Sequence, residues 1–150
     1  MKSVVNATRV SSASSDLFAS LMLTRGEAMK RRVRVVMCKS ADGKTCTPSG
    51  SWQQGWIVFV DSNGDGERAA SEPLLQSKQP MGAALRLTAT SPVAKYVSYS
   101  PTGATLLVGG GFQAGTLTVC SQSAGTTNAR QVILSATGRP RTQKVQLPSC

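Results

Sequence analysis

The sequence predicts an α+β fold in which one N-terminal helix packs on antiparallel β-sheets. Two observations support this fold class: apolar residues recur at helical spacing over residues 1–32, and they alternate with a period of two from residue 33 onward. The chain has 150 residues, which is the size of one compact domain able to bury a core. We therefore expect a single domain, with a helix over 1–32 and a β-rich body over 33–150.

The helical pattern runs from about Ser3 to Arg32 without a proline. Its apolar residues recur at spacings of three, four or seven, which is typical of an amphipathic helix with a single apolar stripe. We expect this stripe to contain Val10, Leu17, Leu21 and Ala28, with Phe18, Met22 and Met29 beside them. Gly26 in the helix interior costs about 1 kcal/mol relative to alanine, so packing on the rest of the protein must stabilise the helix.

Beyond the helix, short alternating segments are separated by clusters of Gly, Pro, Asn and Ser, which is typical of an antiparallel sheet system. The first predicted strand, 33–38, is followed by a turn at 40–43, from which the chain returns through Cys46. The other predicted strands are 56–60, 74–76, 84–89, 94–100, 105–108, 116–120, 130–135 and 142–147. The glycine run 109–111 is interpreted as a turn or bulge.

The tryptophans allow two interpretations. Trp52 and Trp56, with Phe59, could form a platform on which nucleic-acid bases stack. In an alternating strand, however, Trp56 shares one face with Val58 and Val60, while Phe59 lies on the other. We therefore expect these aromatic side chains to pack in the core and not to contact a ligand.

Composition limits the function classes. Lysine and arginine outnumber the acids 17 to 7, so the surface should attract polyanions such as nucleic acid, anionic lipid or acidic polymer. The chain has no histidine, which removes Ser-His-Asp catalysis, Cys-His catalysis and every histidine-ligated metal site. We expect neither an enzyme nor a cofactor.

The four cysteines lack the CxxC spacing of zinc and thioredoxin-like sites, and their even number favours disulfides in an oxidising compartment. Four cysteines permit three pairings. We predict a bond from Cys38 to Cys46, which flank a turn, and one from Cys120 to Cys150, which ties the last residue to an inner strand. The chain has no signal peptide and no apolar run long enough to span a bilayer, yet its cysteines indicate export. We therefore expect a targeting segment to precede this region.

An acidic segment fits the spacing of an EF-hand calcium loop. Asp61–Gly66 places oxygen-bearing side chains at alternating positions, and Glu72 supplies the distal carboxylate. However, a strand of β-branched and aromatic residues enters the segment where an EF-hand has a helix, and Arg68 occupies a position usually held by an apolar residue. We favour a polar β-turn whose Asn, Asp and Gly residues adopt positive φ, and we expect no metal there.

Several segments occur in an order that resembles a known family. These are Thr24–Ala28 at the helix end, Val33–Cys38, Cys46, Trp52 and Gly55–Asp61. Together they resemble the GspH/FimT pseudopilin family, closest to the FimT-type minor pilins of the type IV pilus. The resemblance implies partner pilins, and contact with the inner membrane through a hydrophobic helical segment that precedes this region. It also implies a periplasm-facing protein that is then assembled into an extracellular pilus, at or near the tip.

The segment Gly138–Arg141 lies between two predicted strands. A Gly-X-Pro turn would expose Arg139 and Arg141 at a hairpin tip, with Lys144 following, and neighbouring guanidinium groups can each bind a phosphate oxygen. The segment resembles the Gly-Arg-x-Arg motif of FimT proteins that bind DNA in natural transformation. The resemblance implies DNA binding through Gly138, Arg139 and Arg141, and Arg130 could extend the basic patch. We expect this binding to be non-sequence-specific, because no segment resembles a recognition helix or a zinc module.

Three alternatives remain open. The segment 138–144 could be a solubilising charged turn. A second basic cluster, formed by Lys30, Arg31, Arg32 and Arg34, is a competing site for DNA. It ranks second, because the preference for cations at the C-terminal end of a helix explains it. The protein could also be a structural minor pilin or type II secretion pseudopilin that primes fibre assembly without binding DNA.

Overall fold

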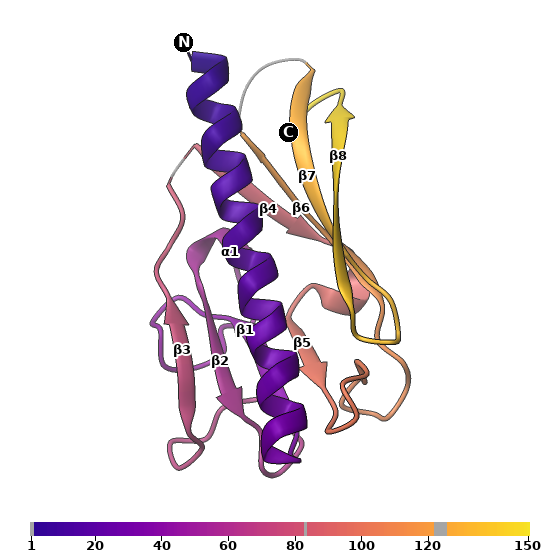
Figure 1. Ribbon diagram of the computed structural model, residues 1–150. Coiled ribbons are helices and arrows are strands. Elements are labelled where there is room, and N and C mark those ends of the chain that lie inside the picture. The colour runs from indigo at the N-terminus through magenta and orange to yellow at the C-terminus, as the bar shows by residue number, and fades with distance from the viewer. Residues whose placement is uncertain (1, 83, 122–125) are drawn as a thin grey trace.

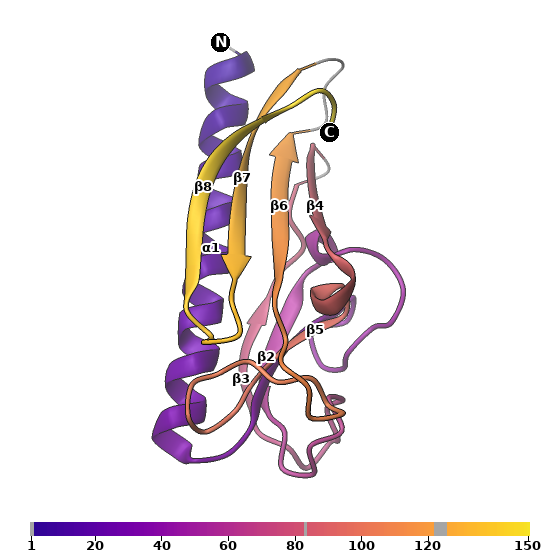
Figure 2. The same cartoon turned by 90° about the vertical axis from the view of Figure 1, so that its right-hand side faces the viewer.

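The computed structural model describes residues 2–82, 84–121 and 126–150, and it shows one long helix and two four-stranded antiparallel sheets (Figures 1 and 2). The helix α1 spans Lys2–Arg31. The strands are β1 (Val35–Lys39), β2 (Trp56–Val60), β3 (Leu74–Lys78), β4 (Leu85–Ala89), β5 (Tyr96–Tyr99), β6 (Gly115–Ser121), β7 (Thr127–Leu134) and β8 (Pro140–Leu147). Two short 3-10 helices are η1 (Trp52–Gln54) and η2 (Ser91–Val93). The predicted α+β class is confirmed.

The helix lies along one side of both sheets and runs the length of the molecule (Figures 1 and 2). The predicted stripe is confirmed, because Val10, Leu17, Leu21 and Ala28 are at most 4% exposed. Met22 and Met29 lie outside it, at 43% and 44% exposure. A helix that packs on sheets along one stripe leaves the residues beyond its margins in solvent.

The C-terminal end of α1 is closed by the chain itself. Arg32 has a φ of +56°, and the amide of Val33 donates a 3.3 Å hydrogen bond to the carbonyl of Ala28. This left-handed residue followed by a bond that spans the last turn is the Schellman arrangement, in which glycine usually occupies the left-handed position. The helix therefore ends within one residue of the predicted boundary.

The first sheet has the strand order β3-β2-β1-β5. Strand β2 matches the predicted range, and its side chains alternate as expected: Trp56, Val58 and Val60 lie in the main core, while Ile57 and Phe59 lie in a small second cluster. The main core also takes residues from α1 and from the second sheet. The predicted core role of the tryptophans is confirmed, and their indole N–H groups are paired with the carbonyl of Val93 and the hydroxyl of Ser20.

The second sheet has the order β4-β6-β7-β8, so β8 lies at its edge. The β7–β8 register pairs Leu134 with Pro140, Ile133 with Arg141 and Arg130 with Lys144. Residues that lie opposite each other point to the same face, and neighbours along a strand point to opposite faces. This register decides which basic side chains can act together.

The prediction of a strand at 105–108 is wrong. Only isolated bridges form there, between Tyr99 and Thr105 and between Leu106 and Phe112. The chain instead turns tightly through 109–111, where the amide of Leu107 bonds to the carbonyl of Gly111. This confirms the turn predicted for the glycine run, and the local bonds replace the regular ladder of a strand.

After the turn at 40–43 the chain returns through Cys46 without forming a strand, since none of the described strands falls between Lys39 and Trp56. The carboxylate of Asp42 accepts hydrogen bonds from the amides of Lys44 and Thr45 at 2.8 Å each, which closes a local turn. Both predicted disulfides are confirmed: Cys38 bonds to Cys46, and Cys120 bonds to Cys150.

Candidate nucleic-acid interface

The Gly-Arg-Pro-Arg segment forms the end of the β7–β8 hairpin. Gly138 has a φ of +90°, and its amide donates a 3.0 Å hydrogen bond to the carbonyl of Ser135. Arg139 is exposed in the turn, as predicted. Arg141 is also exposed, but it lies within β8 and not at the tip, because the strand begins at a buried Pro140. Proline is tolerated at the first position of an edge strand because its missing N–H interrupts no ladder.

Two contacts fix this turn against the rest of the protein. The buried hydroxyl of Tyr99, from β5, donates a 2.7 Å hydrogen bond to the carbonyl of Gly138. Burial raises the pKa of the Tyr99 phenol far above its usual value, so the group remains a proton donor at neutral pH. A side chain at Gly138 would clash with the carbonyl oxygen of Gly103. Glycine is therefore required here both by its φ and by the close approach of a second loop.

A third guanidinium group lies near the turn. Arg25, from α1, donates a 3.0 Å hydrogen bond from Nε to the carbonyl oxygen of Gly103, the same atom that packs against Gly138. We did not predict this placement, because no local pattern relates the helix to the loop at 100–104. The only signal in the sequence was a basic residue on a helix whose apolar stripe already faced the sheets.

Arg139 and Arg141 have no partner among the residues that the structure describes. Neither side chain forms a salt bridge or a hydrogen bond with any residue in the described ranges. By contrast, Arg31 in the competing basic cluster pairs with Glu27 at 2.8 Å, and Arg34 donates a 3.1 Å hydrogen bond to the hydroxyl of Ser98. The guanidinium groups of the turn are thus available to an external anion.

Arg130 and Lys144 lie on the other face of the sheet. They are directly opposite each other, and Arg130 also pairs with Val119 of the core-facing side. Both line an open pocket of about 430 Å³ between β7–β8 and the N-terminal half of α1, beside Ala7 and Val10. The five residues predicted to bind DNA therefore divide into a turn group and a helix-side pair.

The outer face of the second sheet, where Arg141 lies, carries a row of polar side chains. The amide of Gln143 donates a 2.7 Å hydrogen bond to Gln131, whose own amide donates a 3.3 Å bond to the hydroxyl of Thr118. This row crosses β8, β7 and β6 in register. Amide and hydroxyl groups beside an arginine add further possible contacts to phosphate oxygens.

The fold and the sequence agree with those of pilins. Two crystal structures of the type IV minor pilin FimU from Pseudomonas aeruginosa strain PAO1 are similar to this chain, each at 19% identity. The first covers 96% of this chain and 96% of FimU with a TM-score of 0.71. The second covers 93% and 98% with a TM-score of 0.66. The architecture is therefore that of the type IV pilin fold.

The family described as type II transport protein GspH matches residues 13–138. The chain belongs to this family of type IV minor pilins and pseudopilins, whose members are in general structural proteins assembled into a fibre. A comparison with curated protein sequences gave no match. In the part of the chain that the structure describes, no helix is both long enough and apolar enough to cross a membrane.

Proposed function

We propose that this minor pilin binds extracellular DNA through Arg139 and Arg141 and takes part in its uptake during natural transformation. The observation that supports this most is the combination of two exposed guanidinium groups, which have no partner in the described part of the chain, with a turn fixed by the bond from Tyr99 to Gly138. A fixed turn lowers the entropy lost when the arginines are held on phosphates. The formal net charge of +10 draws DNA to the surface.

Binding of this kind is largely independent of base sequence. Guanidinium groups on phosphates set position and affinity but read no base edges. The basic residues concerned lie on a turn and on edge strand β8, and α1 is packed along the sheets. None of the described elements is placed like a recognition helix that enters the major groove.

The edge position of β8 offers a way for both basic groups to contact one duplex. Arg141 and Lys144 point to opposite faces, but side chains from both faces of an edge strand reach the same open side. They are three residues apart, so about 10 Å separates them along the strand. Measured along the axis of a DNA duplex, that distance corresponds to about three phosphates of one strand. Lys144 and Arg130 then provide a weaker extension of the site.

The remaining parts of the proposal concern location and partners. The protein is held at the inner membrane, facing the periplasm, before it joins other pilins at or near the pilus tip. The exposed Met22 and Met29 on α1 offer apolar surface to neighbouring pilins in the fibre. Retraction of the fibre, driven by other proteins, then carries bound DNA inward.

A second candidate function is supported by the family match. The GspH description concerns type II transport, so a pseudopilin that only primes fibre assembly is the alternative. In that case the arginines of the turn serve solubility or contact an acidic surface of another pilin. The two candidates differ in whether the isolated protein binds DNA.

The test is fluorescence anisotropy with two labelled duplexes of equal length and unrelated sequence. The parent should bind both with similar affinity, and Arg139→Gln/Arg141→Gln should lose most of that affinity on both. Arg31→Gln/Arg32→Gln removes the same charge elsewhere and should change binding less. Absence of binding by the parent would favour the assembly pseudopilin, and loss confined to the Arg31/Arg32 variant would move the site to the helix end.

A further inference from the structure

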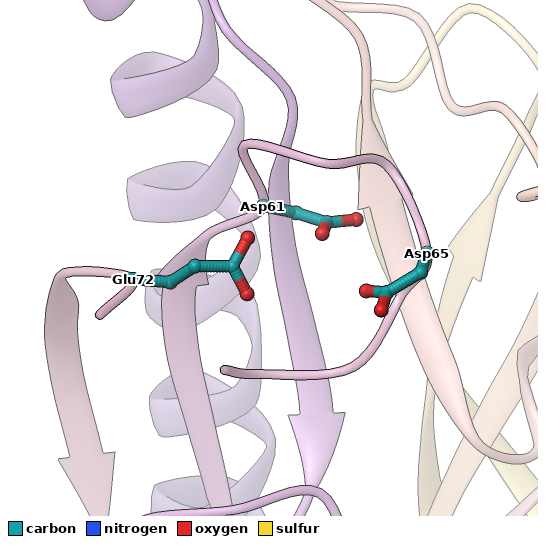
Figure 3. A group of neighbouring side chains, drawn as sticks. All are labelled: Asp61, Asp65 and Glu72. Carbon is teal, nitrogen blue, oxygen red and sulfur yellow. The ribbon is translucent and has the colours of Figure 1, made fainter. Parts of the chain in front are cut away.

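Three carboxylates converge in the connection between β2 and β3. Asp61 directly follows β2, Asp65 lies in the turn, and Glu72 lies just before β3. One oxygen from each lies within 4.8 Å of the others. Figure 3 shows the carboxylate of Asp61 between those of Asp65 and Glu72.

The central carboxylate is buried and only half satisfied. Asp61 is 1% exposed; its Oδ2 accepts a 2.9 Å hydrogen bond from the amide of Gly66, and its Oδ1 has no hydrogen-bond partner among the described residues. Glu72 is also buried, at 4% exposure. In the described ranges, no lysine or arginine forms a salt bridge with any of the three acids. The oxygens of Glu72 accept hydrogen bonds from the amides of Ser62 and Ala69, at 2.6 Å and 2.8 Å. Buried charges are usually paired or bound to a metal, and Asp61 has neither kind of partner among the described residues.

The pKa of Asp61 also indicates that its charged form lacks a positive partner. Burial raises the pKa of the Asp61 carboxyl, and the neighbouring charges of Glu72 and Asp65 raise it further. The hydrogen bond from Gly66 and the charge of Arg34 oppose this rise in pKa but do not reverse it. A cation between the carboxylates would offset their mutual repulsion by its positive charge, and it would give Oδ1 of Asp61 a partner.

We propose that Asp61, Asp65 and Glu72 form a calcium-binding site. The strand that enters the segment favours a polar turn without a metal. Such a turn would not explain why Oδ1 of Asp61 is buried without a hydrogen-bond partner among the described residues. Calcium takes six to eight oxygen ligands at about 2.3–2.6 Å, so two ligands on opposite sides of the ion are about 4.6–5.2 Å apart. The observed spread of at most 4.8 Å fits that sphere.

Two further features fit calcium. Gly66 has a φ of +78° at the place where a calcium loop turns sharply, and the three acids occupy the first, fifth and twelfth positions of such a loop. Asp65 is exposed, so water can enter from its side and complete the coordination. The site is thus closed on the side of Asp61 and open on the side of Asp65.

Bound calcium would stabilise one end of the first sheet. The loop already contacts two other segments: the Cys46 Sγ lies 3.7 Å from the carbonyl of Gly66, and a Cβ added to Gly66 would lie 2.7 Å from a methyl group of Val108. The ion would tie this loop to both the end of β2 and the start of β3. This consequence is independent of DNA binding.

Thermal melts with calcium, with magnesium and with a chelator provide the test. At calcium concentrations about 100 times the dissociation constant, the melting temperature should rise by roughly 5 °C or more above that with chelator. Magnesium at the same concentration should produce a much smaller rise, because it demands shorter, octahedral coordination. Calorimetric titration should give a dissociation constant on the order of 0.1–1 mM, the range of extracellular calcium modules.

Three variants make the test specific. Asp65→Asn removes the negative charge of an exposed ligand without disturbing the core and should weaken calcium binding by about tenfold or more. Asp61→Asn should abolish the calcium-dependent rise even if it alters the melting temperature without metal. Glu67→Gln removes an exposed acid of the same loop that lies outside the converging group, and it should retain the full response. No rise at 10 mM calcium, an equal rise with magnesium, or an unchanged response in Asp65→Asn would overturn the proposal.

Discussion

The hydroxyl of Tyr99 on β5 donates a 2.7 Å hydrogen bond to the carbonyl of Gly138, in the turn between β7 and β8. This buried bond joins the first sheet to the hairpin of the second sheet that carries Arg139 and Arg141. The position of the arginines therefore depends on contacts between the two sheets as well as on the sequence of the turn.

Tyr99→Phe should destabilise the protein by about 1–3 kcal/mol, because it leaves the carbonyl of Gly138 buried without a donor. Urea denaturation measures this loss. Tyr96→Phe is the matched control: the hydroxyl of Tyr96 accepts a hydrogen bond from the exposed amide of Val108, which water can replace. Equal losses in the two variants would mean that the Tyr99 bond has no special role.

Gly138→Ala should cost more stability than Gly110→Ala. Both glycines have positive φ, at +90° and +98°, so each substitution carries a backbone penalty on the order of 1–3 kcal/mol. Only at Gly138 would the new Cβ also clash with the carbonyl of Gly103, whereas Gly110 has open space around it. Thermal melts of the two variants should separate the steric contribution from the conformational one. Similar melting temperatures would show that the loops can move apart without cost.

Lys144→Glu should raise stability by about 0.2–1 kcal/mol. Lys144 lies directly opposite Arg130, and like charges at such positions repel, whereas opposite charges attract. Arg141 lies opposite the uncharged Ile133, so Arg141→Glu should not produce this gain in stability. Denaturation at low and high salt checks the cause, because added salt should reduce the difference between Lys144→Glu and the parent. A salt-independent difference would point to packing.

Replacing Cys120 and Cys150 with alanine should lower the free energy of unfolding by about 3.5 kcal/mol on the chain-entropy estimate for a loop of this length. The bond spans 30 residues and holds the end of the chain against β6. Chemical denaturation of the double variant against the oxidised parent measures this effect. A loss below about 1 kcal/mol would show that the chain end stays in place without the bond.

Local patterns predicted much of the fold. Strand β2 was predicted residue for residue because Trp56–Val60 is a short run of β-branched and aromatic residues followed by a polar turn. The helix stripe and the Cys38–Cys46 bond were also predicted from local spacing and turn position. The segment 105–108 was mistaken for a strand because its apolar residues bond to loops, and those contacts are determined by tertiary structure.

The candidate site was only partly predictable. The exposure of Arg139 follows from the turn itself, but the separation of Arg141 from Lys144 depends on where β8 begins. Once the strand starts at Pro140, an offset of three residues places the two cations on opposite faces. Arg25 and Tyr99 support the turn through contacts across more than 35 residues of sequence, for example the 39 that separate Tyr99 from Gly138. No sequence pattern records such contacts.

The most direct test of DNA binding through the turn is the salt dependence of affinity for a labelled duplex, measured by anisotropy. If Arg139, Arg141 and Lys144 each neutralise one phosphate, the logarithm of the association constant should fall against the logarithm of salt with a slope of roughly −2 to −3. Arg139→Gln/Arg141→Gln should flatten this slope by about 2, while Arg31→Gln/Arg32→Gln should leave it nearly unchanged. A slope that is unaltered in the Arg139/Arg141 variant, or that flattens only in the Arg31/Arg32 variant, would contradict the proposed site.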